Sequence, residues 1–193
     1  MSRASQADAA KHREQVVTAT SELLRERGAA GMSVGDVMSS AGLTHGGFYK
    51  HFGSKDELLG VATAAAFAEL VDSLVRLNQT TDPLPGLLTD YLSKTHRDTP
   101  GTGCVNTGLA ADAARAGADS PMRQAYAEGL SAAIEQITEL HDPATRGQDE
   151  ARRRGIEYLA TMVGALTLAR ASAGAPISDE ILKTVHTALT NRL

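Results

Sequence analysis

Apolar and polar positions in the first part of the chain recur with the period of amphipathic helices. Over residues 11–27 the apolar side chains return every three to four positions among charged ones, and Gly28 follows where a helix commonly ends. Ser33, with Asp36 three residues later, is a weak capping box that indicates the start of a short helix ending near Ala41. The pattern therefore predicts two successive helices in this part of the chain.

The next segment predicts a second short helix followed by a long one. Thr44 is placed to cap the short helix, which carries three aromatic side chains and is closed by Gly53. Two short helices joined through residues 42–43 form a helix-turn-helix pattern. Residues 54–57 are a full capping box, and the apolar pattern then continues as one long helix to Leu77.

The remaining apolar pattern predicts five further helical segments, separated by breaks rich in Pro and Gly. They run roughly over residues 84–96, from just after Gly103, over residues 120–140, over residues 148–173 and over residues 178–192. The composition is 42% hydrophobic, with no Trp and few other aromatic residues, which favours helices over strands. We therefore expect an all-α fold.

The charge balance gives little information about partners. The formal net charge is -4, whereas a nucleic-acid-binding protein is usually basic. Residues 1–60 hold seven Lys or Arg and seven Asp or Glu, so the acidic excess lies in the later part of the chain. A neutral segment can still present a positive face, so DNA binding has to be judged from the helix-turn-helix motif and not from the charge.

Cysteine usage and the N-terminus indicate the compartment. The single cysteine, Cys104, excludes an intramolecular disulfide, and no apolar run reaches the roughly 18 to 20 residues that span a bilayer. Residues 1–13 lack the apolar region of a secretory signal. The six histidines show no spacing typical of a helical metal site, and no cofactor motif is present. We expect a cytoplasmic protein without a bound metal or cofactor.

The helix-turn-helix pattern supplies both a small core and an outward face, as a DNA-reading helix requires. The core candidates are Val34, Val37, Met38, Leu43, Phe48 and Phe52. The outward candidates are Thr44, His45, Gly46, Gly47, Tyr49, Lys50 and His51. Each glycine inside a helix costs about 0.5–1 kcal/mol relative to alanine. We interpret the glycine pair as a place where the backbone approaches DNA closely.

Over residues 11–60 the sequence resembles the tetracycline-repressor (TetR) family of bacterial regulators without a gap. The resemblance is carried by Arg13 and Gly28, by Ser33-Val34-x-Asp36-Val37, by Ala41-Gly42-Leu43-Thr44-x-Gly46-x-Phe48-Tyr49-x-His51-Phe52 and by Ser54-Lys55-Asp56-x-Leu58-Leu59. It implies a three-helix helix-turn-helix DNA-binding domain over residues 1–53 and a helical effector-binding and dimerisation domain over residues 54–193. It further implies a homodimeric repressor that a small-molecule effector releases from a near-palindromic, double-stranded operator.

The resemblance also implies roles for individual residues. The expected DNA-binding residues are Ser33, Thr44, His45, Gly46, Gly47, Tyr49, Lys50, His51 and Lys55. Ser33, Thr44 and Lys55 are expected at phosphates. Gly35 and the glycine pair depart from the common family pattern, so the resemblance gives no base specificity.

For the second domain, the resemblance implies two sets of residues, an apolar one and one of mixed apolar and polar character. On the two last helices, the expected dimer interface is formed by Ile156, Leu159, Ala160, Val163, Ile181, Val185 and Leu189. The expected effector pocket is formed by Phe67, Leu70, Leu74, Tyr91, Cys104, Asn106, Met122, Tyr126, Met162 and Leu166. For any single residue in these sets, ordinary core packing is the alternative.

Cys104 has two interpretations. It begins a predicted helix after three residues rich in glycine, where the helix dipole favours a thiolate. Some TetR-like regulators that resemble this chain around a Gly-Cys pair sense oxidants or electrophiles with such a thiol. A lone cysteine is otherwise a small buried apolar residue.

Other classes of function stay open as alternatives. The chain is alternatively a helical hairpin of another all-α protein, a small-molecule binding protein of the same fold without DNA function, or a cofactor-free hydrolase using Ser33. Residues 31–35 have the spacing of a nucleophile elbow, but that motif needs a preceding strand where a helix is predicted. Residues 96–98 match a kinase catalytic loop without the other kinase motifs. We therefore expect no enzymatic activity and no catalytic residues.

Overall fold

The computed structural model describes residues 3–141 and 143–193, and Met1, Ser2 and Asp142 lie outside the described residues. No strand occurs among the described residues, so the all-α expectation is confirmed. The elements are α1 (Arg3–Arg27), α2 (Val34–Ser40), the 3₁₀ helix η1 (His45–Lys50), α3 (Lys55–Leu77), α4 (Pro83–Tyr91), α5 (Lys94–Asp98), the 3₁₀ helix η2 (Pro100–Thr102), α6 (Val105–Arg115), α7 (Pro121–Glu139), α8 (Pro143–Arg146), α9 (Gln148–Ala171) and α10 (Pro176–Thr190).

The predicted end of α1 and start of α2 are confirmed by their caps, whereas α1 begins at Arg3, eight residues before the predicted start. Gly28 ends α1 with a φ of 69°, a left-handed conformation that residues with a side chain rarely adopt. At the start of α2, the backbone N–H of Asp36 donates to Ser33 Oγ at 3.1 Å. In return, the Asp36 carboxylate accepts from the Ser33 backbone N–H at 2.7 Å. These two bonds form the capping box that the sequence predicts.

The second short helix differs from its prediction in two respects. Residues 45–50 form a 3₁₀ helix instead of an α-helix, and the Thr44 side chain makes no capping hydrogen bond. At the start of α3, Ser54 Oγ accepts from the Glu57 backbone N–H at 3.0 Å, as expected. The Glu57 carboxylate, however, accepts from the backbone N–H of Gly53 instead of Ser54. The predicted capping box is therefore only half formed.

The segment predicted as one helix over residues 84–96 is divided in two. The chain breaks between α4 and α5, where Ser93 Oγ accepts from the backbone N–H of His96 and caps a new helix. A serine inside an apolar pattern offers the backbone an alternative to continuing the helix. The bounds of α6, α7, α9 and α10 agree with the sequence pattern to within a few residues.

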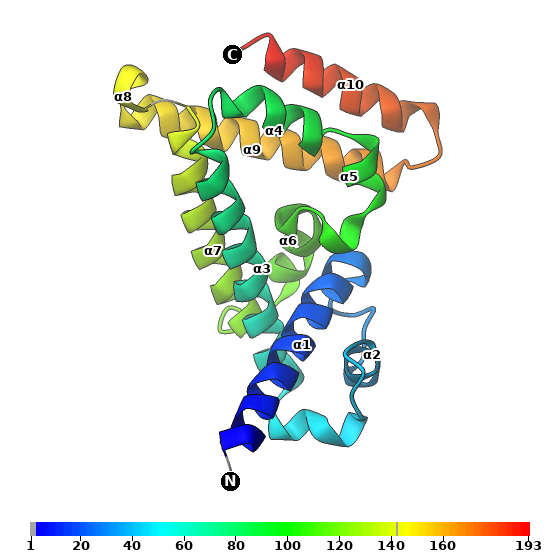
Figure 1. Ribbon diagram of the computed structural model, residues 1–193. Coiled ribbons are helices and arrows are strands. Elements are labelled where there is room, and N and C mark those ends of the chain that lie inside the picture. Colours follow the sequence, from blue (N-terminus) through cyan, green and yellow to red (C-terminus); the bar gives the residue numbers. More distant parts are fainter. Residues whose placement is uncertain (1–2, 142) are drawn as a thin grey trace.

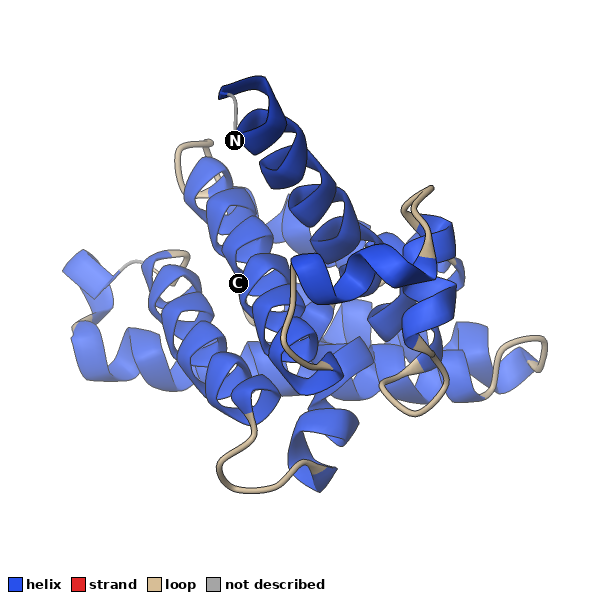
Figure 2. Cartoon of the chain, turned by 90° about the horizontal axis from the view of Figure 1, so that it is seen from below, coloured by secondary structure: helices blue, strands red, loops and turns tan. Residues whose placement is uncertain are grey.

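The helices are arranged as a head, formed by α1, α2 and η1, and a body, formed by the remaining helices. Figure 1 shows α1, α2 and η1 at one end of the molecule and α4, α9 and α10 together at the other end. Helices α3 and α7 run between the two ends. The contact between α3 and α7 is the most extensive in the described chain, and α6 packs against α1, α7 and α9. Seen from below, the described segments are helices joined by loops (Figure 2).

The first hydrophobic core joins the head to the body. It contains apolar residues of α1, α2, η1, α3, α6 and α7, among them Leu24, Phe48, Phe52, Leu58 and Phe67. Two further cores lie within the body, one under α4, α9 and α10 and one between α3, α7 and α9. The packing therefore continues across residue 53, so a movement in the body can reach the head directly.

One helix is more apolar than the sequence analysis allowed. By length and composition, α3 is apolar enough to cross a membrane, contrary to the expectation that no such stretch exists. Its apolar side chains Leu58, Leu59, Ala62, Ala66 and Phe67 are buried against the surrounding helices. Burial on several sides accounts for the composition of a central helix.

Candidate DNA-binding surface and effector cavity

The residues predicted to contact DNA lie on the head, at or beside η1. Thr44, His45, Gly46, Tyr49 and Lys50 are exposed, and Gly47 and His51 are half-buried. Tyr49 is 73% exposed, which is unusual for an aromatic side chain in a monomeric protein. Below this surface the Phe48 and Phe52 rings are buried, 5.8 Å apart, and the Arg13 guanidinium lies 4.8 Å from the centre of the Phe52 ring. A rigid base thus supports an exposed polar surface.

Ser33 already has partners within the chain. Its hydroxyl donates to the Asp36 carboxylate at 2.7 Å, and hydrogen bonds from the Ser33 side chain and backbone hold the pKa of Asp36 below its usual value. A phosphate contact through this hydroxyl therefore has to compete with the cap. The helix and turn that precede Ser33 also differ from the strand that a nucleophile elbow requires.

The turn between α1 and α2 is held from two sides. The Lys55 ammonium donates to the carbonyl oxygens of Ala29 at 2.8 Å and Met32 at 2.6 Å. On the other side, the Asp112 carboxylate on α6 accepts from the Ala29 backbone N–H at 2.8 Å. Lys55 therefore positions the head, and its predicted phosphate contact stays a prediction. Asp112 was missed by the sequence analysis, because nothing in the pattern of α6 indicates a partner in the head.

Part of the predicted effector set meets at one cavity of about 260 Å³. Leu70, Tyr91 and Cys104 line it, together with Arg25, Ala66, Glu69, Ser73, His96, Thr102, Gly103 and Val105. Cys104 is buried, and Tyr91 is half-buried. The wall thus combines an apolar surface with a thiol, a phenol and an imidazole, as a binding site for a small organic molecule requires.

His96 fixes the geometry around Cys104. Its Nδ1 lies 2.8 Å from the carbonyl oxygen of Tyr91, which can only accept, so Nδ1 carries the proton. Its Nε2 then accepts from the backbone N–H of Cys104 at 2.9 Å. Burial lowers the pKa of His96, and nearby Arg170 acts in the same direction. Through these two hydrogen bonds, the neutral His96 imidazole holds the start of α6 against the end of α4.

The two tyrosines of the set remain neutral phenols. Burial raises the pKa of Tyr91 above its usual value, and it raises the pKa of Tyr126 to about 12. The Tyr126 hydroxyl donates to Asn106 Oδ1 at 2.9 Å, and the Tyr126 ring packs edge-on against Phe67. Asn106 is buried, and its Nδ2 has no hydrogen-bond partner in the described part of the chain.

Other members of the predicted effector set lie in the hydrophobic cores and do not line this cavity. Leu74 belongs to the core between α3, α7 and α9, and Met162 to the core under α4 and α10. Leu166 is fully buried, and Met122 packs in the first core. The helical period placed these residues on inward faces correctly, but it does not distinguish a cavity wall from a filled core.

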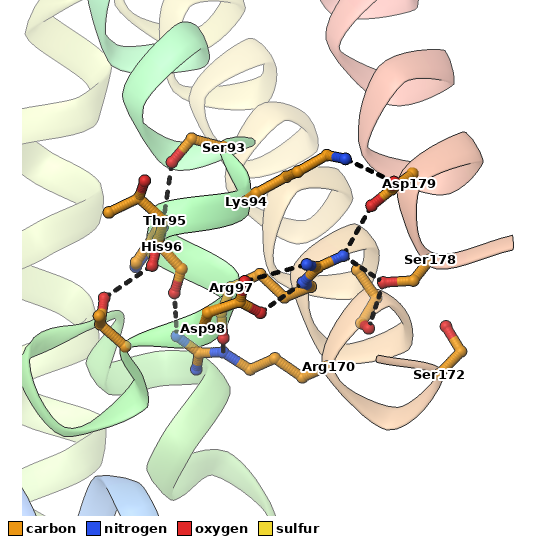
Figure 3. A network of polar contacts seen from close by, with 12 residues as sticks. Ser93, Lys94, Thr95, His96, Arg97, Asp98, Arg170, Ser172, Ser178 and Asp179 are labelled. Atoms are coloured by element: carbon orange, nitrogen blue, oxygen red, sulfur yellow. Dashed lines mark hydrogen bonds and ion pairs between the residues drawn. The ribbon is translucent and has the colours of Figure 1, made fainter. Parts of the chain in front are cut away.

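A second cavity, of about 510 Å³, lies where the end of α1 meets α6 and α9. Arg25, Thr107 and Arg170 line it, and Arg25 lines both cavities. Figure 3 shows how Arg170 reaches from α9 to the carbonyl oxygens of His96 and Arg97. Neither arginine is predicted from the sequence as a site residue, because each stands in the last turn of a helix, where a basic residue is common.

The predicted dimer residues divide into two groups. Leu159 and Leu189 are buried within the protomer, in contrast to the expectation, because each faces the neighbouring helices of its own chain. Ile156 and Ala160 are exposed, and Val163, Ile181 and Val185 are half-buried. The exposed apolar face of α9 and α10 continues through residues absent from the predicted set, namely Gly164, Leu168 and Ile177. These exposed apolar side chains are a candidate interaction surface.

No group of three or more His, Cys, Asp or Glu residues suited to hold a metal ion occurs in the described part of the chain.

Comparison with known proteins agrees with this arrangement. Residues 16–62 match the family model of bacterial regulatory proteins, tetR family. The fold is similar to that of reduced Escherichia coli NemR, with a TM-score of 0.77 at 21% identity over 94% of this chain and 97% of that one. It is also similar to a TetR transcriptional regulator from Chloroflexus aurantiacus, with a TM-score of 0.74 at 24% identity over 95% of this chain and 96% of that one.

A third similar structure contains a ligand. It is the transcriptional regulator FadR from Bacillus subtilis in complex with stearoyl-CoA, with a TM-score of 0.65 at 14% identity over 93% of this chain and 98% of that one. No curated protein sequence matches this chain.

A helix-turn-helix head on a helical body with open cavities is the architecture of a DNA-binding transcriptional regulator. Residues 16–62 thus carry the DNA-binding domain that the tetR family model describes, and the whole chain shares the fold of solved TetR-family transcriptional regulators.

Proposed function

We propose that this regulator is a cytoplasmic homodimeric repressor that leaves its operator when a small molecule binds in its body. In this proposal, residues 1–53 bind DNA, and residues 54–193 bind the effector and form the dimer. The observation that carries the proposal is the exposed pair Tyr49 and Lys50, which stands on the base of Phe48 and Phe52, with the Tyr49 ring edge-on against Phe48 but largely open to solvent.

The DNA contacts that we propose are divided by chemistry. His45, Gly46, Tyr49 and Lys50 face the base edges or the adjacent backbone, and Thr44 and His51 face phosphates. Open space at Gly46 supports this assignment, since a Cβ there would meet no atom of the chain within 4 Å. Glycine is therefore not required by internal packing, and it leaves room for close approach to DNA.

The exposed apolar face of α9 and α10 supports the dimer. Two copies joined through this face by a two-fold axis would place their recognition segments about 34–36 Å apart, one turn of DNA. The operator is then a near-palindrome with half-sites one turn apart.

Alanine at Lys50 or Tyr49 is expected to weaken operator binding by about ten- to a hundredfold, because a base-edge contact contributes about 1–3 kcal/mol. If Lys50 instead contacts a phosphate, its alanine variant will reduce the salt dependence of binding. Operator fragments selected from genomic DNA are titrated by fluorescence anisotropy at several salt concentrations. Lys183→Ala, an exposed position on α10, is the matched control.

Both Lys50→Ala and Tyr49→Ala should remain dimers. Operator binding unchanged in both variants would remove η1 from the DNA interface. A complete lack of DNA binding by the unmodified protein would instead favour the alternative, a small-molecule binding protein that keeps the fold without the DNA function.

The release step follows from linkage. An effector can shift the regulator only by the difference in its affinity for the DNA-bound and free arrangements. The contacts of Lys55 and Asp112 with the turn between α1 and α2 join the body to the head, so a displacement of α6 changes the position of η1.

An electrophile or oxidant acting at Cys104 is one mode of release that we propose. The thiol lines the smaller cavity, beside Tyr91 and His96, and an adduct there would displace the start of α6. Cys104→Ser is expected to abolish release of operator DNA by N-ethylmaleimide or hypochlorite, measured by the same anisotropy assay. Release that persists in the variant would exclude the thiol mechanism.

A further inference from the structure

Two arginines without a carboxylate partner among the described residues line the larger cavity. Arg25 comes from the last turn of α1 and Arg170 from the last turn of α9, and both side chains are half-buried. Among the described residues, no carboxylate lies within ion-pair distance of either guanidinium. Cations that lose part of their hydration without a counterion are costly in a folded protein, so their retention here calls for a partner.

The neighbouring Arg97 shows the contrast. Its guanidinium donates to Asp179 at 2.8 Å and to Asp98 at 2.7 Å, and it also donates to the Ser178 hydroxyl (Figure 3). Arg97 is therefore neutralised within the chain, and it fastens α5 to α10. The same cavity thus contains one arginine with its carboxylates and two without.

Other charged groups around the cavity leave an excess of positive charge. The charged residues that line it are Arg25, Arg97 and Arg170 with Glu26 and Asp98, which leaves one net positive charge. Glu22 and Glu69 act on Arg25 only at longer range, and they oppose the effect of burial, which lowers the pKa of Arg25. Burial also lowers the pKa of Arg170. A single bound anion would balance the site.

The two guanidiniums keep donors for such an anion. Arg25 uses its Nε to donate to the carbonyl oxygen of Gly101 at 2.5 Å. Arg170 uses Nε and Nη2 to donate to the carbonyl oxygens of Arg97 and His96. The Nη groups of Arg25 and the Nη1 of Arg170 have no acceptor in the described part of the chain, and Thr107 lines the same cavity. Guanidinium groups suit the planar, two-oxygen geometry of a carboxylate.

We propose that the effector of this regulator is a small organic monocarboxylate, whose carboxylate binds in the larger cavity between Arg25 and Arg170. This inference rests on the proposed effector-controlled regulation and names the chemical class of the ligand. A cavity of about 510 Å³ falls in the range typical of small-molecule sites.

The position of Arg25 connects this site to DNA binding. Arg25 belongs to α1, whose middle contacts the segment just after η1, where the Arg13 guanidinium lies over the Phe52 ring. A carboxylate that draws Arg25 away from the Gly101 carbonyl loosens the contact between α1 and the loop before α6. The ligand therefore acts on the first helix of the head itself, in addition to any displacement of α6.

The test uses the full-length dimer without DNA. Octanoate and benzoate are titrated by isothermal titration calorimetry at constant ionic strength, beside octanamide and benzamide as neutral probes of the same shape. We expect at least one carboxylate to bind and its amide to bind at least about tenfold more weakly, the usual effect of losing a charge-assisted hydrogen bond. Absence of binding by both carboxylates, or equal binding of the amides, would overturn the proposal.

Variants then locate the site. Arg25→Gln is expected to weaken carboxylate binding at least about tenfold, Arg25→Lys less, and Arg123→Gln, an exposed control on α7, not at all. Arg170→Gln is expected to match Arg25→Gln, with circular dichroism reporting its fold because Arg170 also caps α5. If Arg170→Gln does not fold, the comparison of glutamine and lysine at Arg25 decides. Binding unchanged in Arg25→Gln would overturn the site.

Failure of this inference is distinguishable from failure of the proposed function. If the operator is bound but no carboxylate binds, the regulator retains its DNA function and has an effector of another class. If a carboxylate binds but the protein does not bind DNA, the ligand site is correct and the proposed repression is wrong.

Discussion

Glutamate in place of Ala160 is expected to convert the dimer into monomers. Ala160 lies at the exposed centre of the apolar stripe on α9, between Ile156 and Gly164. Burying an unpaired carboxylate there costs about 3 kcal/mol, and a two-fold interface repeats the cost, so the dimer dissociation constant should rise about 10⁴-fold. A monomer binds one half-site only, whereas in a dimer the first bound head raises the effective concentration of the second head at its half-site. Operator affinity should therefore fall at least about a hundredfold.

Sedimentation velocity measures the first effect, and operator anisotropy measures the second. Ser131→Glu, which places the same charge on the exposed surface of α7, is the control and should remain a dimer. A dimeric Ala160→Glu protein with normal operator affinity would show that α9 does not form the interface.

Alanine in place of Gly129 is expected to be the most destabilising small substitution in the body. The added Cβ would overlap the Phe67 ring, with Cδ2 only 2.6 Å away, at the place where α7 crosses α3. Phe67 is fully buried against Tyr126 and cannot move without disturbing the first core. Overpacking of this kind costs about 3 kcal/mol, which lowers the melting temperature of a protein of this size by about 6–12 °C.

Gly86→Ala is the matched control for this substitution. Gly86 lies inside α4, and a Cβ there would meet no atom of the chain within 4 Å. The gain in helix propensity should stabilise the protein by about 0.5–1 kcal/mol. Thermal unfolding followed by circular dichroism measures both variants. A melting temperature of Gly129→Ala equal to that of the unmodified protein would show that α3 and α7 are farther apart than described here.

The sequence predicted elements best where the signal is local. The caps at Ser33 and Ser54 and the end of α1 at Gly28 depend on hydrogen bonds between residues within four positions of each other. Thr44 makes no capping hydrogen bond, and η1, which contains Gly46 and Gly47, winds as a 3₁₀ helix over the packed rings of Phe48 and Phe52. Helix propensity is a weak prior where tertiary packing decides.

The candidate sites were harder to predict than the elements. Periodicity identifies an apolar face, but it does not say whether that face meets the same chain or a second one, as Leu159 and Ala160 show. Arg25 and Arg170 were missed for a different reason. They meet only because the ends of α1 and α9 converge on η2 and α5, and no short-range pattern encodes that meeting.

The 3₁₀ winding of η1 sets the spacing of any contacts along DNA. The five steps from His45 to Lys50 rise by about 2.0 Å each, or about 10 Å in total, whereas the same steps in an α-helix would cover about 7.5 Å. The exposed side chains of this segment are therefore spread over about 2.5 Å more along its axis than in an α-helix of equal length, and any bases that they contact are spaced accordingly.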